Sequence, residues 1–183
     1  MGHKRILGKT RDFITGREIT DTDDERLRQK LARLLVEEKG YAREDIEVKR
    51  RLELKIDDKT VLSMVDFVVA MKGRSFMVIR YGPGSLVTRE RPALAVARIL
   101  EPYQIPLTVV TNGEDAEVLD TLSGEVTGTG LHSIPDREAL ERLSDIPLQP
   151  LPAKHLETEK RVLSAYDWLE HSLECDDDWC AAE

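Results

Sequence analysis

Two apolar runs between Lys59 and Gly84 constrain the fold of this chain more than any other stretch. Each run is short, rich in β-branched residues and bounded by turn residues, and residues 72–74 join them. These features predict a buried β-hairpin. Its only carboxylate is Asp66. A buried acid costs several kcal/mol unless it is paired, hydrogen-bonded or bound to a metal. Asp66 is therefore either a metal ligand in a nuclease-type site or an acid at a strand end paired with an arginine.

Length and composition fit a single globular domain, since 183 residues with 40% hydrophobic residues can bury a proper core. The basic N-terminus is not followed by the apolar stretch of a signal peptide. No later segment approaches the eighteen apolar residues of a membrane span. These features predict a cytoplasmic protein that does not enter a membrane.

Negative charge is concentrated at the end of the chain. Residues 170–183 contain six acids and no Lys or Arg, and removing them from the total of −8 leaves −2 for residues 1–169. That balance lacks the basic footprint of a protein that grips nucleic acid by itself. Cys175 and Cys180 lie in the same segment. Two thiols can bind a soft metal or form a disulfide, but a structural zinc site needs four ligands, so an acidic solvated tail is predicted.

The first half of the chain predicts a helix followed by three antiparallel strands. Residues 1–20 are predicted to be an irregular or short-stranded lead-in. Thr22 and Glu25 form a capping box, so a helix is expected from there to about Lys39, ending at Gly40. Apolar and charged residues then alternate from Ile46 to Ile56, which predicts a half-exposed strand that turns into the central hairpin.

The second half predicts a crossover helix and further strands. A helix is expected over about residues 89–100, ended by Pro102, and is followed by strands at 105–111 and 116–122. A strand, a helix and a buried strand in succession predict at least one parallel pair. A short helix from 135–136 to 143, a proline-rich link at 147–152 and a helix over about 156–173 complete the α/β chain. The predicted divisions are 1–20, 21–146, 147–173 and 174–183.

Three segments resemble the N-terminal nuclease domain of the type I restriction enzyme R subunit, within the PD-(D/E)XK superfamily. They are the helix start at 24–29 with its Glu-x-x-Arg-Gln, the strand segment 65–69, and residues 106–113 with their Thr-Asn-Gly turn. The resemblance covers roughly residues 21–143. It implies a restriction-endonuclease-like core, made of a helix, a three-stranded antiparallel meander, a helix and further strands, with C-terminal helices added.

The resemblance also implies a magnesium site. In that fold an Asp from the second strand and a Glu-x-Lys on the third serve phosphodiester hydrolysis: the two carboxylates hold Mg²⁺ and the lysine positions a water. Asp66 matches the first acid. Arg80 stands either at the lysine position, with Val78 as the acid, or at the acid position, with Gly82 as the lysine. Neither register restores the motif. The resemblance also implies a glutamine on the second helix, and no glutamine lies between residues 89 and 100. The site is therefore predicted to be degenerate.

Charge favours the same conclusion. A guanidinium about 4 Å from the site repels each unit of positive charge by about 4 kcal/mol at an effective dielectric near 20. Arg80 beside Asp66 would therefore oppose Mg²⁺ and pair with the acid. Two other acids are candidates for a relocated ligand, Glu25 in the first helix and Glu90 in the second. Glu25 is alternatively a helix cap, and Glu90 a solvated helix start.

The loop before the second helix is a candidate phosphate site. Its glycines and Ser85 precede a helix N-terminus and are flanked by Arg80, Arg89 and Arg91. Backbone N–H groups at such a position can cradle a phosphate. The alternative is a tight strand-to-helix connection.

Three functions are open for the chain. The leading hypothesis is a non-catalytic nuclease-fold domain that binds DNA or a protein partner. The alternative is a magnesium-dependent DNA endonuclease that uses Asp66 as metal ligand with Glu25 or Glu90. The third is a structural partner whose last helix and acidic tail dock on another chain. Magnesium is the only cofactor expected, and only for the active enzyme.

Overall fold

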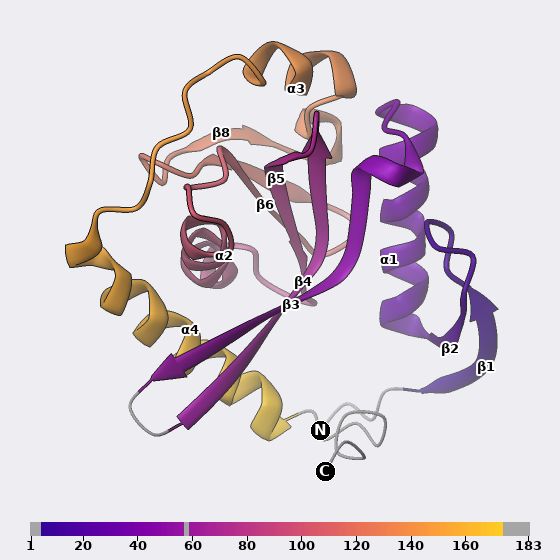
Figure 1. Ribbon diagram of the computed structural model, residues 1–183. Helices are drawn as coiled ribbons and strands as arrows, with labels where there is room; N and C mark the ends of the chain where they lie inside the picture. Colours follow the sequence, from indigo (N-terminus) through magenta and orange to yellow (C-terminus); the bar gives the residue numbers. More distant parts are fainter. Residues whose placement is uncertain (1–4, 57–58, 174–183) are drawn as a thin grey trace.

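A six-stranded mixed sheet, with strand order β3-β4-β5-β6-β7-β8, forms the centre of the computed structural model (Figure 1). Strands β1 and β2 form a separate two-stranded sheet. The strands are β1 (Ile6–Arg11), β2 (Glu18–Thr22), β3 (Ile46–Ile56), β4 (Lys59–Met71), β5 (Arg74–Tyr81), β6 (Leu107–Thr111), β7 (Ala116–Asp120) and β8 (Val126–Thr129). The helices are α1 (Asp23–Arg33), α2 (Val87–Ile99), α3 (Arg137–Leu143) and α4 (Ala153–Leu173).

The structure describes residues 5–56 and 59–173. The predicted acidic tail with Cys175 and Cys180, and the predicted turn at Asp57-Asp58, lie outside these residues. Within the described part of the chain, no helix is long and apolar enough to cross a membrane.

Helix α1 begins where the capping box predicts. The Thr22 hydroxyl accepts the backbone N–H of Glu25 at 3.1 Å, which satisfies one of the free donors of the first turn. The α-helix passes into a π-helical turn at Leu34–Glu38, and Gly40 follows with a φ of 75°. The predicted end of the helical segment near Lys39 is therefore confirmed.

The three consecutive antiparallel strands are also confirmed. β3 pairs with β4 from Ile46 opposite Val69 to Ile56 opposite Lys59. β4 returns into β5 through Lys72 and Gly73, whose φ values are 52° and 76°. Two central residues with positive φ are typical of the two-residue hairpin turn that matches strand twist.

The crossover gives the predicted parallel pair. Helix α2 connects β5 to β6, and these two strands run parallel with Met77 opposite Leu107. Helix α2 starts two residues before the predicted Arg89. β6 starts at Leu107 rather than at the predicted residue 105. Pro106 has no backbone N–H to donate to a strand ladder, so the strand begins after it. The hairpin β1–β2 and the edge strand β8 were not specified by the sequence pattern.

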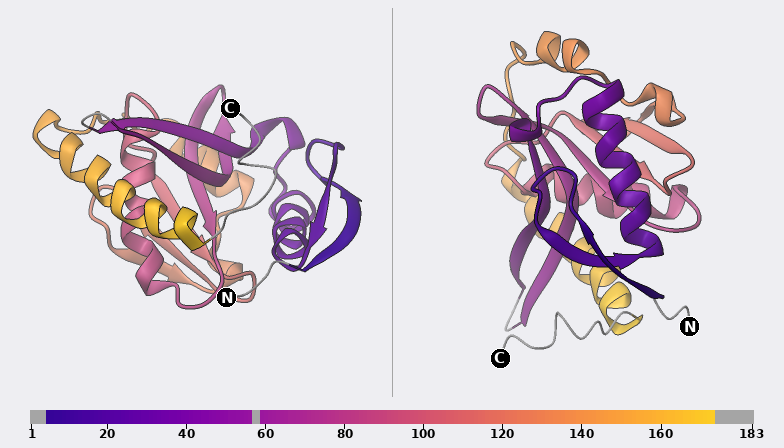
Figure 2. Two further views of the ribbon diagram at one scale, coloured as in Figure 1. Left: turned by 90° about the horizontal axis from the view of Figure 1, so that it is seen from below. Right: turned by 90° about the vertical axis from the view of Figure 1, so that its right-hand side faces the viewer.

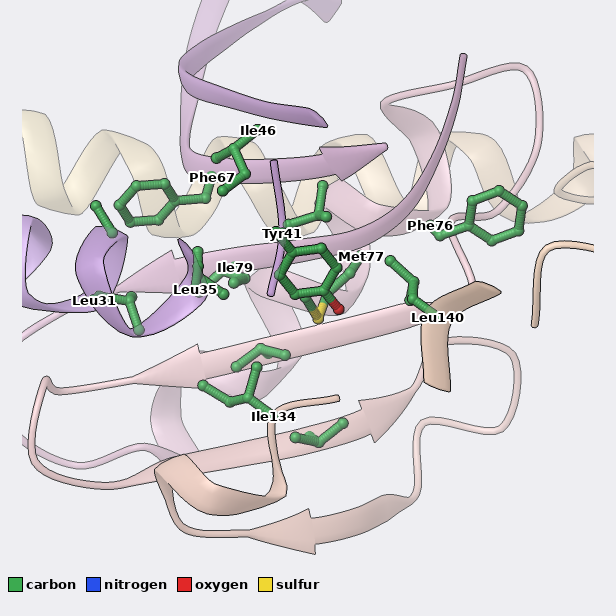
Figure 3. Close-up of a cluster of buried hydrophobic side chains, with 14 of the residues drawn as sticks. Leu31, Leu35, Tyr41, Ile46, Phe67, Phe76, Met77, Ile79, Ile134 and Leu140 are labelled. Carbon is green, nitrogen blue, oxygen red and sulfur yellow. The ribbon is translucent and has the colours of Figure 1, made fainter. Parts of the chain in front are cut away.

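Helices cover both faces of the sheet (Figure 1). On one face, Leu31 and Leu35 from the α1 segment pack against Phe67 and Ile79 of the sheet (Figure 3). On the other face, α2 and α4 cover a second cluster that includes Val68 and Val78 of the sheet. Alternate residues of β4 and β5 therefore face different helices.

The β3–β4 hairpin extends beyond the sheet as an arm. The last ladder pair of β4 with β5 is Phe67 opposite Ile79, so residues 59–65 of β4 pair only with β3. The arm lies along α4, which contacts both of its strands (Figures 1 and 2). β4 and β5 thus separate at Asp66. We call this point of separation the strand fork, and Asp66 lies in it.

Candidate functional site

Asp66 lies in the strand fork and bonds to the strand that diverges from it. The backbone N–H of Tyr81 donates to Asp66 Oδ2 at 2.7 Å. The carboxylate thereby satisfies a backbone donor just past the last β4–β5 ladder pair. Asp66 is thus a structural acceptor as well as a charged group.

The other oxygen of Asp66 is bound by an arginine from α1. Arg28 Nε donates to Asp66 Oδ1 at 2.6 Å, and the two side chains are 22% and 11% exposed. Burial alone would lower the pKa of Arg28, but the neighbouring carboxylates, Asp66 first, raise it above its ordinary value. Arg28 therefore stays charged, and its contact with Asp66 ties α1 to the fork.

Glu25 lies one helical turn before Arg28 and extends the cluster to β3. Its carboxylate is 3.7 Å from Arg28 Nη1 and 2.9 Å from Lys49 Nζ, and it accepts a hydrogen bond from Gln29. Lys49 reaches it from a left-handed backbone conformation, with a φ of 53°, that is uncommon for a residue other than glycine. The Glu25 backbone is capped by Thr22, while its side chain is part of the ionic cluster.

Tyr81 contacts the cluster through its hydroxyl and its ring. Its hydroxyl donates to Asp24 at 3.0 Å, and the Arg28 guanidinium lies 5.1 Å from its ring centroid. Burial and then the Asp24 carboxylate raise the pKa of Tyr81 to about 12. The phenol therefore stays protonated at neutral pH and acts as a donor.

Two arginines lie close to the fork in the chain, Arg80 near the end of β5 and Arg89 in the first turn of α2. Continuing the β4–β5 register by one residue sets Arg80 opposite Asp66. Gly82, two residues further on, has no side chain, and a Cβ there would overlap the guanidinium of Arg89. Arg89 thus occupies the space that a lysine at residue 82 would need.

Two of the predicted residues lie at the start of α2, Ser85 in the loop before it and Arg89 in its first turn. Arg89 Nη2 donates to the carbonyl of Pro83 at 3.1 Å, and Ser85 accepts from Thr88 through its carbonyl at 3.1 Å. Leu86 stands at the N-cap of α2 and has no side-chain acceptor to offer the first turn. Arg89 and Ser85 therefore flank this helix start.

Arg91 forms an ion pair with a residue of α4 instead of contributing to the loop. Its guanidinium pairs with Glu159 at 2.5 Å, and Arg98 pairs with the other oxygen of that carboxylate at 3.1 Å. Glu159 is only 4% exposed. Arg91 therefore contributes to the contact between α2 and α4.

Glu90 lies beside Glu117 of β7 rather than beside Asp66. Burial first, and then the neighbouring Glu90 carboxyl, raise the pKa of Glu117. β7 is three strands from β4 in the sheet, about 14 Å at 4.8 Å per strand. The structure thus does not bring Glu90 and Asp66 together.

The raised pKa of Glu117 predicts a pH-dependent stability. Because the folded state holds this proton more tightly than the unfolded state, ionising Glu117 opposes folding at neutral pH. Glu117→Gln should therefore stabilise the domain at neutral pH, by less than about 1 kcal/mol because the carboxyl is partly exposed. The gain should disappear as the pH falls below the ordinary Glu value of 4.5. Urea unfolding across this pH range measures it, with the exposed Glu125→Gln as control; an equal gain at every pH would contradict the assignment.

The residues around Asp66 do not fit a magnesium ion. Both Asp66 oxygens accept hydrogen bonds, and the β4–β5 register, continued by one residue, sets Arg80 opposite Asp66. Among the described residues, no group of three His, Cys, Asp or Glu side chains could hold a metal. The cluster is an ionic network in which arginine and lysine supply the positive charge.

Fold and site together define a mixed α/β domain with an ion-paired acid where two central strands separate. The chain belongs to the family described as type I restriction enzyme R protein N terminus (HSDR_N), whose model matches residues 23–135. The match begins with α1 and ends before α3, so it includes the whole strand fork. No similar curated protein and no similar solved structure was found.

Two members of the cluster were not assigned a role from the sequence. Arg28 lies three residues after Glu25, and that spacing puts both on one helix face. Lys49 lies between the β3–β4 pairs Val48–Phe67 and Arg50–Val65, the stretch of the hairpin that contains Asp66. The helical spacing predicts the contact of Arg28 with Glu25, but neither spacing predicts the contact of Arg28 with Asp66.

Proposed function

We propose that this chain is a restriction-endonuclease-like domain of the PD-(D/E)XK superfamily whose catalytic site is degenerate and which binds the DNA backbone. The observation that carries the proposal is the Arg28–Asp66 ion pair at the strand fork. In a nuclease of this fold the acid would be available to a metal ion. Here the surroundings of the acid favour binding without hydrolysis.

The loop at the start of α2 is the proposed phosphate contact. It offers backbone N–H groups at a helix N-terminus, the exposed Ser85 and the Arg89 guanidinium, all next to the fork. Helix N-termini and arginine forks are both suited to phosphate oxygens. Arg80 lies at the end of β5 that leads into this loop.

The charge balance limits how strongly such a domain can bind. The net charge of −8 provides little long-range attraction to DNA. If about two phosphates are neutralised, the logarithm of the binding constant should fall with the logarithm of salt concentration with a slope of about −2. The proposed role is a weak, salt-sensitive contact within a larger assembly.

Fluorescence anisotropy of a labelled DNA duplex, measured from low to physiological salt, tests this proposal. Arg89→Ala and Arg80→Ala should each weaken binding at low salt about threefold to tenfold and reduce the salt slope by about 1. Arg142→Ala is the matched control. It is exposed on α3, which packs at the opposite end of β5 through the contact of Arg74 with Ser144. If the wild-type domain binds no duplex even at low salt, DNA binding is wrong and a protein partner is favoured.

A magnesium-dependent endonuclease is the second candidate function. It is favoured by the position of Glu25, a second buried acid that shares Arg28 with Asp66. For this function Arg28 would have to leave the cluster. Magnesium-dependent nicking of a plasmid that is lost in Asp66→Asn would support it.

A further inference from the structure

We propose that the guanidinium of Arg28 takes the place of a metal ion on Asp66, so that the fork is closed by a side-chain cation. The inference rests on the proposed nuclease-type fold, because that fold makes Asp66 the metal-binding acid. It adds a role for one residue, Arg28, and predicts that the domain needs no dissolved cation at this position.

Each carboxylate oxygen of Asp66 already accepts a hydrogen bond. Arg28 Nε lies 2.6 Å from Oδ1, and the Tyr81 backbone N–H lies 2.7 Å from Oδ2. Magnesium binds carboxylate oxygens at about 2.1 Å and requires near-octahedral space around it. The Arg28 guanidinium occupies that space on Oδ1.

Arg28 also contacts groups other than Asp66. Its guanidinium is shared with Glu25 at 3.7 Å and stacks on the Tyr81 ring at 5.1 Å. The nearby Asp24 carboxylate also raises the pKa of Arg28. One guanidinium thus links several acidic side chains, as a bound cation would.

The local charge count predicts what removal of Arg28 does. Three carboxylates, Asp24, Glu25 and Asp66, face the positive charges of Arg28 and Lys49. With Lys49 and with Arg80, which the register sets opposite Asp66, removal of Arg28 leaves one net negative charge. It also leaves Glu25 and Asp66 without the guanidinium they share, and a divalent cation could take its place. With Arg28 present, a divalent cation would meet a fixed positive charge at close range and be repelled.

The test is calorimetric titration of Mn²⁺ and Mg²⁺, together with thermal unfolding in each ion. Wild-type protein should show no binding at Asp66 and no metal-dependent shift of the melting temperature. Arg28→Ala should bind Mn²⁺ at least tenfold more tightly than wild type and melt at a higher temperature when Mn²⁺ is present. The gain should vanish in the double variant with Asp66→Asn.

Two further variants keep the test decisive. Arg28→Lys retains a cation at the site and should stay insensitive to metal, even if Arg28→Ala folds poorly. Arg26→Ala removes an exposed arginine of the same helix, paired with Asp21, and should behave as wild type.

Two results would overturn the inference: Mn²⁺ binding by wild type that Asp66→Asn abolishes, or a folded Arg28→Ala that gains no metal binding. Both differ from a failure of the proposed DNA contact, which the anisotropy of Arg80 and Arg89 variants measures without metal. If the duplex is not bound and the metal results are as expected, the role of Arg28 stands alone.

Discussion

Asp66→Ala should lower the free energy of unfolding by about 3–5 kcal/mol, the typical cost of removing one partner of a buried ion pair. The substitution leaves the Arg28 guanidinium buried without its main counter-charge and removes the acceptor of the Tyr81 N–H. Two unsatisfied groups would remain where β4 and β5 separate. Equilibrium urea unfolding at neutral pH measures the loss.

A double-mutant cycle separates the ion pair from the loss of packing. Arg28→Met keeps an apolar chain of similar length, so the double variant of Arg28→Met and Asp66→Ala should recover part of the stability lost in Asp66→Ala. Asp21→Ala is the control, since its partner Arg26 is 60% exposed, and should cost much less than Asp66→Ala. A cost for Asp66→Ala no greater than that of Asp21→Ala would show that the pair does not hold the fork.

Leu163→Ala should destabilise the domain by about 2–5 kcal/mol, because it removes a fully buried leucine and leaves a cavity. Leu163 is 0% exposed and lies in the cluster formed by α2, the arm and the sheet. Leu163 belongs to α4, which lies beyond the matched residues 23–135. A large loss would show that α4 completes the core of the same folding unit.

Leu156→Ala on the same helix is the matched control. Leu156 is 37% exposed, so the same chemical change should cost far less there. Denaturant unfolding of both variants gives the comparison. Equal, small losses would mean that α4 does not contribute to the core.

Local patterns predicted the elements whose side chains alternate or repeat along one face. The capping box placed the start of α1, and the alternation of apolar and charged residues, broken only at Arg50, placed β3 from Ile46 to Ile56. The β1–β2 hairpin was less evident because its residues are exposed or half-buried, so no buried stripe marks the strands. β8 is four residues long and contains a glycine, which gives a short pattern with little signal.

The site depended on contacts that sequence patterns do not encode. Asp66 was identified as an unusual buried acid, and an arginine partner was one of its two interpretations. That partner is Arg28, 38 residues away in the chain, and only the packing of α1 against the fork reveals it. The contact of Arg91 with Glu159 joins residues 68 positions apart. Long-range ion pairs of this kind follow from the fold and cannot be read from local spacing.

Plasmid nicking in the presence of Mg²⁺ tests the central claim most directly, with wild type and Asp66→Asn prepared side by side. The account predicts that wild-type protein leaves supercoiled plasmid intact, as does Asp66→Asn, because Arg28 holds the acid that a metal ion would need. Nicking by wild type that disappears in Asp66→Asn would contradict the account and identify the fork as an active nuclease site.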